Sequence, residues 1–167
     1  MDPRGILLVD DESDIRLIAK MELEAHGFLV ESCESGQEAL EKAKGFHPDL
    51  ILLDVTMPAM DGPTLLGELR KIPGIEYVPV IFMTASTLPH QISRYREMNA
   101  EVIGKPFCLE TFSSTIQEIF SRLVGLGGPG GPAREGKHEA GNFVPPSPFD
   151  GEDERQNFRK KADAIRQ

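Results

Sequence analysis

The sequence predicts an α/β fold in which a doubly wound, five-stranded parallel sheet carries helices on both faces. Three observations lead to this fold class. Short apolar runs alternate five times with segments whose apolar residues recur at helical spacing. The runs are apolar at successive positions, which is typical of strands buried on both faces of a parallel sheet. Right-handed crossovers between successive parallel strands then place helices on both sides of the sheet.

Each predicted element follows from its own pattern. The predicted strands are brief apolar runs, and they lie at residues 6–9, 28–30, 50–53, 78–83 and 102–103. The helices between and after them are predicted at about residues 15–23, 36–44, 65–69, 92–95 and 112–123. The pair His26–Gly27 ends the first helix, and Asp61–Gly62 followed by Pro63 indicates a turn and the start of the third helix. The last helix has the cleanest apolar stripe and the fourth is poorly amphipathic.

Composition and charge exclude several classes of protein. The chain has 167 residues, of which 40% are hydrophobic and 27% charged, a globular composition. The net charge of −9 argues against nucleic-acid binding, since phosphate contacts need a basic face. Two cysteines, Cys33 and Cys108, cannot build a disulfide framework and are expected to be free thiols. There is no signal-peptide pattern and no apolar run long enough for membrane insertion, so we expect a cytoplasmic protein.

The chain is predicted to divide into three parts. Residues 1–124 form the compact domain, and almost all of the net negative charge lies there. Residues 125–136 are rich in Gly and Pro and read as a flexible linker. Residues 137–167 are polar, and we expect most of this tail to be disordered, with a short helix at 152–166 as the alternative.

Polar side chains follow four of the five predicted strands. In chain order they are Asp10 and Asp11 after the first strand, Asp54 after the third, Thr84 after the fourth and Lys105 after the fifth. Because parallel strands end at one edge of the sheet, these five residues are expected to converge on one shallow cleft.

The chemistry of this set points to phosphoryl transfer. Three carboxylates at close range repel one another unless a cation neutralises them, and Mg²⁺ prefers such oxygen ligands. An aspartate held beside a metal and a lysine can act as a nucleophile toward phosphorus. The cation, the Lys105 ammonium and the Thr84 hydroxyl can each take one non-bridging oxygen of the phosphoryl group.

Four motifs in this order give the chain a specific resemblance. They are Asp10–Asp11, the run from Asp54 to Gly62, the run from Phe82 to Ala85, and the run from Gly104 to Phe107. Over about residues 4–124 the chain resembles the receiver domain of two-component response regulators. The resemblance implies the flavodoxin-like strand order 2-1-3-4-5.

The resemblance also implies roles for the site residues. Asp54 would accept a phosphoryl group from a histidine kinase or a phosphotransfer protein. Asp11, Asp54 and the backbone carbonyl of Thr56 would ligate Mg²⁺, with Asp10 contributing through water. Thr84 and Lys105 would bind the phosphoryl group and report it to the face formed by the fourth helix, fifth strand and fifth helix. Such a protein is no enzyme, because it supports only its own phosphoryl transfer and the hydrolysis of its aspartyl phosphate.

One position departs from the family, and two other functions stay open. Receivers usually carry an aromatic or His residue three positions before the lysine, and here it is Val102. A scaffold that keeps the fold without phosphorylation is therefore an alternative. A phosphatase of the haloacid-dehalogenase type is disfavoured, because its nucleophile lies on the first strand in an Asp-x-Asp arrangement. Too few residues follow the linker for a folded DNA-binding domain, so we expect a stand-alone receiver that signals through a downstream protein partner.

Overall fold

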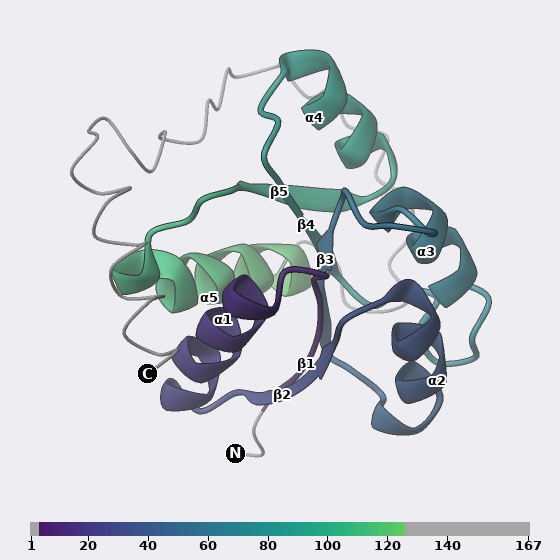
Figure 1. Ribbon diagram of the computed structural model, residues 1–167, viewed down its shortest axis with the longest axis horizontal. Helices are drawn as coiled ribbons and strands as arrows, with labels where there is room; N and C mark the ends of the chain where they lie inside the picture. The colour runs from purple at the N-terminus through teal and green to yellow at the C-terminus, as the bar shows by residue number, and fades with distance from the viewer. Residues whose placement is uncertain (1–3, 126–167) are drawn as a thin grey trace.

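The computed structural model describes residues 4–125 (Figure 1). Five strands alternate with five helices in these residues. The strands are β1 (Gly5–Val9), β2 (Leu29–Cys33), β3 (Leu50–Asp54), β4 (Val80–Thr84) and β5 (Ala100–Gly104). The helices are α1 (Ser13–Ala25), α2 (Gly36–Phe46), α3 (Gly62–Leu69), α4 (Pro89–Glu97) and α5 (Leu109–Gly125). The predicted alternation of strands and helices is confirmed.

The strands form one parallel sheet in the order β2-β1-β3-β4-β5. This is the strand order that the resemblance implied, and it makes β3 the central strand. Figure 1 shows α1 and α5 together on one face of the sheet and α2 and α3 on the other, with α4 beside β5. The doubly wound fold is therefore confirmed.

Alternate side chains of each central strand enter two separate cores. Leu7, Ile51 and Phe82 pack against α2, α3 and the Tyr95 ring of α4. Their neighbours in the strands, such as Leu52, pack against α1 and α5 on the opposite face. Strands β1, β3 and β4 are buried along their whole length, because both of their faces are covered.

Both edge strands are longer than predicted. Strand β2 continues past Val30 to the buried Cys33, although Glu31 and Ser32 between them break the apolar run. An edge strand pairs on one side only, so polar side chains are tolerated there. At the other edge, β5 extends two residues before Val102 for the same reason.

The turn before α3 forms as the sequence predicts. Asp61 is the N-cap residue, and its carboxylate accepts a hydrogen bond from the Thr64 N–H at 2.8 Å. Both cysteines are free, with Cys33 buried and Cys108 half-buried. None of the helices in the described part of the chain has the length and apolar character needed to cross a bilayer. The predicted linker beyond Gly125 and the tail at 137–167 lie outside the described residues.

Candidate functional site

The carboxyl edge of the sheet gathers side chains from four of its strands. Asp10 directly follows β1, Asp54 and Thr84 are the last residues of β3 and β4, and Lys105 directly follows β5. Asp10, Asp54 and Thr84 are almost wholly buried. Four of the five residues predicted to converge therefore lie at one edge with their side chains largely shielded from solvent.

Lys105 is the electrostatic centre of this site. Its Nζ lies 2.7 Å from Oδ2 of Asp10 and 3.3 Å from Oδ2 of Asp54. Only 7% of the lysine side chain is exposed, so these are ion pairs of low solvent screening. The backbone N–H of Lys105 donates to the carbonyl of Thr84 at 2.7 Å, which fixes β5 to β4 next to the site. The Lys105–Pro106 peptide bond is cis.

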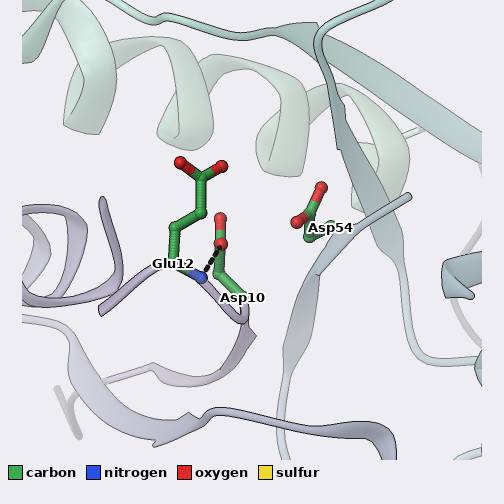
Figure 2. Close-up of side chains that lie close together, drawn as sticks. All are labelled: Asp10, Glu12 and Asp54. Carbon is green, nitrogen blue, oxygen red and sulfur yellow. Dashed lines mark hydrogen bonds between the residues drawn. The ribbon is translucent and has the colours of Figure 1, made fainter. Parts of the chain in front are cut away.

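A third carboxylate approaches Lys105, that of Glu12, for which no role was predicted. Oε1 of Glu12 lies 3.2 Å from the Lys105 Nζ. The Glu12 N–H donates to Oδ1 of Asp10 at 2.9 Å, a local turn that brings the Glu12 side chain back to the edge of the sheet (Figure 2). Carboxylate oxygens of Asp10, Glu12 and Asp54 lie within 4.8 Å of one another. The signal for this residue was its place directly after Asp10 and Asp11.

Asp11 and Thr56 take more peripheral positions. Asp11 is exposed, and its carboxyl group contributes a hydrogen bond that raises the pKa of Asp54. Thr56 is also exposed, and its N–H donates to Oδ1 of Asp54 in a long hydrogen bond of 3.4 Å. Both residues therefore lie beside the Asp54 carboxylate, on the solvent side of the buried pair of aspartates.

Gly62 allows the loop after β3 to close against the end of that strand. A Cβ atom at position 62 would lie 2.4 Å from the carbonyl oxygen of Asp54 and 3.0 Å from Cα of Val55. The Gly62 N–H donates to the carbonyl of Val55 at 2.8 Å, so the backbone returns directly onto the strand end. Within the same loop Ala59 adopts a positive φ of 65°, which completes the sharp turn.

The two buried aspartates have raised pKa values. Burial raises the pKa of Asp54 to about 7, and the negative charge of Asp10 adds to this effect, while Lys105 opposes it. Burial also raises the pKa of Asp10, again against the influence of Lys105. The same carboxylates raise the pKa of Lys105, although burial of the ammonium opposes this. The positive charge of Lys105 is therefore favoured at this site, whereas ionisation of the two buried aspartates is costly.

The donor set fits a hard divalent cation. The side chains of Asp10, Glu12 and Asp54 offer only oxygen atoms, which are the ligands that Mg²⁺ prefers. Oδ2 of Asp10 is fully buried and accepts no hydrogen bond of good geometry from the described residues, although the Lys105 ammonium lies close by. A buried carboxylate oxygen with spare acceptor capacity is suited to a cation or to its bound water.

Thr84 has a hydroxyl at the same edge of the sheet. Its Oγ1 accepts a hydrogen bond from the Ser86 N–H at 3.0 Å, which leaves the hydroxyl proton available as a donor. Val102 lies two residues before the end of β5 and is half-buried. No aromatic ring is present at that position to alternate between buried and exposed states.

This combination of fold and site defines a class of protein. A sheet of order 2-1-3-4-5 brings a buried aspartate, further carboxylates, a threonine and a lysine to its carboxyl edge, which is typical of signalling receiver domains. The family model "Response regulator receiver domain" matches residues 6–117. The chain therefore belongs to the receiver-domain family of two-component response regulators.

Individual relatives agree with this assignment. The chain is 34% identical over 125 residues to the transcriptional regulatory protein TrcR of Mycobacterium tuberculosis, covering 74% of this chain and 45% of that protein. It is 34% identical over 120 residues to the sensor kinase CckA of Brucella abortus, covering 70% of this chain and 12% of CckA. The chain thus spans between 12% and 56% of the length of the curated relatives that it matches.

Solved structures match the receiver over nearly their whole length. The chemotaxis protein CheY4 of Vibrio cholerae is 31% identical with a TM-score of 0.66, and the match covers 70% of this chain and 98% of CheY4. A receiver domain of the hybrid histidine kinase CckA is 32% identical with a TM-score of 0.57, covering 70% of this chain and 98% of that structure.

Proposed function

We propose that the protein is a phosphorylation-dependent receiver in which Asp54 accepts the phosphoryl group. The observation that carries this proposal is the placement of Asp54 at the end of the central strand, with the Lys105 ammonium 3.3 Å from its Oδ2. The partner that supplies the group is a histidine kinase or a phosphotransfer protein, as is general for receiver domains. The protein then signals by contacts with a downstream protein.

The transfer itself needs little beyond positioning and charge neutralisation. An oxygen of the Asp54 carboxylate attacks phosphorus, an O–P bond forms, and the bond from phosphorus to the donor breaks. The electron pair of the broken bond leaves with the donor group. Lys105 then faces the transferred phosphoryl group, and the Thr84 hydroxyl can donate a hydrogen bond to another of its oxygens.

The chain's own carboxylates are suited to hold Mg²⁺ during this step. We assign Asp10, Asp11, Asp54 and the backbone carbonyl of Thr56 as its ligand set, with Asp10 contributing directly or through water. Glu12 is close enough to join the cluster. When bound, the cation offsets the repulsion among the carboxylates and the charge of the phosphoryl oxygens.

Incubation of the full chain with acetyl phosphate and Mg²⁺, followed by intact-mass measurement, tests the proposal. The wild-type chain should gain one phosphoryl group, and the Asp54→Asn variant should gain none. Asp61→Asn is the matched control, because Asp61 lies in the same loop but is exposed and caps α3. This control should be phosphorylated like the wild type.

Two results would contradict the proposal. Unchanged phosphorylation of Asp54→Asn would place the acceptor elsewhere. Failure of the wild-type chain to gain mass, with folding verified by circular dichroism, would favour the alternative of a receiver-fold scaffold that works without phosphorylation.

A further inference from the structure

An apolar cavity of about 360 Å³ opens between α4, β5 and α5, away from the carboxylates. Its apolar lining comes from all three elements and from the start of the loop between β5 and α5. The lining includes Ile92, Val102, Ile103, Phe107, Phe112 and Ile119. A cavity of this size and composition is suited to one or two large apolar side chains.

The inner wall of the cavity favours an aromatic ring. Phe107 and Phe112 stack with their ring centroids 4.1 Å apart, and both residues belong to the lining although they are almost wholly buried. Aromatic rings pack favourably against such pairs, either stacked or edge to face. The short aliphatic side chain of Val102 supplies no ring of its own to this space.

The rim of the cavity carries charges of both signs, and one of its two acidic side chains has no ion-pair partner within the range 4–125. Glu101 is satisfied by two arginines, with Arg122 at 3.4 Å and Arg96 at 3.9 Å. Glu118, also on the rim, forms no ion pair with another residue in the range 4–125. A ligand with an apolar anchor and adjacent positive charge therefore matches the rim.

The chain itself continues from the end of this cavity. Helix α5 lines the cavity as far as Arg122 and ends at Gly125, and the sequence runs on to Gln167. Phe158 follows Gly125 by 33 residues. A flexible chain of that length has a root-mean-square span of about 30 Å. Helix α5, with its 17 residues, is about 25 Å long, so the segment around Phe158 can reach any part of the cavity.

The sequence of this segment complements the cavity. Phe158, Ala162 and Ile165 recur at helical spacing, and Phe158 is followed directly by Arg159, Lys160 and Lys161. Residues 155–167 contain five Lys and Arg against one Asp, a net charge of +4. Residues 4–125 contain 11 Lys and Arg against 19 Asp and Glu, a net charge of −8. The terminal segment is thus basic, the receiver is acidic, and the aromatic anchor lies beside the basic run.

We propose that residues 155–167 dock into the cavity of their own chain, with Phe158 against the Phe107–Phe112 pair and the following basic residues along Glu118. The segment then covers the face through which a receiver of this kind contacts its downstream partner. Docking is weak and reversible, because the tether supplies only a millimolar effective concentration of the segment. The length of the tether adds little to the cost of docking, since the entropy of loop closure grows slowly with length. This proposal does not depend on phosphorylation of Asp54.

Cys108 offers a direct measurement, since it lines the cavity and is half-buried, whereas Cys33 is buried in the core. The rate at which a maleimide labels Cys108 in the full chain reports the fraction of time that the cavity is open. We expect the segment to be docked about four-fifths of the time, so that Cys108 is accessible for about one-fifth of the time. The Phe158→Ala variant should then be labelled about fivefold faster than the wild type. High salt should also raise the labelling rate of the wild-type chain, because it screens the attraction between the basic segment and the acidic receiver.

The matched control is Phe143→Ala, which removes another tail phenylalanine outside the proposed segment. Its labelling rate should equal the wild-type rate. Equal rates for wild type and Phe158→Ala would overturn the proposal, and so would an equal rise in both variants, which would indicate non-specific shielding by the tail. The protection should also persist on dilution. Protection that disappears at low protein concentration would mean that a second copy supplies the segment, and the intramolecular proposal would be wrong.

Discussion

The carboxyl group of Asp54 is costly to ionise in the native protein. Its pKa is raised to about 7, above the value in an unfolded chain, so the native state holds a proton that the unfolded state has released. Between about pH 4 and pH 7 this group therefore lowers the free energy of unfolding as the pH rises. In metal-free buffer, the cost is fully present above pH 7 and absent below about pH 4.

Removal of this charge should therefore stabilise the metal-free protein. We expect Asp54→Asn to raise the melting temperature at pH 8 by roughly 3–8 °C, which corresponds to about 1–2 kcal/mol in a chain of this size. The gain should shrink toward pH 4.5. Asp61→Asn is the control. Hydrogen bonds from Thr64 lower the pKa of Asp61, so removal of this charge should lower the melting temperature at pH 8. Thermal melts at both pH values check this, and a gain that is equal at both would contradict the assigned cause.

The residues of the site were predictable to different degrees. Asp10, Asp54, Thr84 and Lys105 could be predicted because each is a polar residue at the end of an apolar strand, and parallel strands end at one edge. Glu12 was not given a role, because its approach to Lys105 depends on a local turn at Asp10. A turn of this kind is set by backbone angles, which the order of residues alone does not specify.

The loop that connects β3 with α3 depends on one glycine for its close approach to the strand. We expect Gly62→Ala to destabilise the protein by about 1–3 kcal/mol, because the new methyl group would overlap the backbone of Asp54. Phosphorylation by acetyl phosphate should also fall, since the acceptor strand end must shift.

Gly67 gives a matched control within the same helix. A Cβ atom at position 67 meets nothing within 4 Å, so Gly67→Ala should stabilise the protein by about 0.5–1 kcal/mol through helix propensity. Denaturant unfolding measures both variants. If the Gly62→Ala protein is as stable as the wild type, the loop can accommodate the methyl group, and the expected overlap with the Asp54 backbone is wrong.

At the level of elements, the buried segments were the most predictable from the sequence. The apolar runs of β1 and β3 and the stripe of α5 were placed nearly at their observed bounds, because burial on two faces or along one stripe requires apolar residues. The extents of β2 and β5 were underestimated. Edge strands are held by backbone pairing on one side, which any residue except proline can supply, so their side chains give little signal.

The receiver should be stable without the residues that follow it. Residues 4–125 contain both cores and all five strands, and the last helix already buries its apolar stripe. We expect a chain that ends at Gly125 to keep its phosphorylation by acetyl phosphate and to melt within a few degrees of the full chain, as for loss of a weakly docked segment. Calorimetry and intact mass check this. Unfolding of the shortened chain would show that the tail is part of the folded core.

Asp54 lies at the end of a strand that is protected on every side. Strand β3 is paired on both sides, with Leu52 opposite Leu8 on one neighbour and Ile81 on the other, and helices cover both of its faces. Its backbone amides should therefore exchange with deuterated solvent only through global unfolding. For the proposed phosphorylation of Asp54, we therefore expect β3 to stay in place and the structural response to occur in the loops that follow β4 and β5.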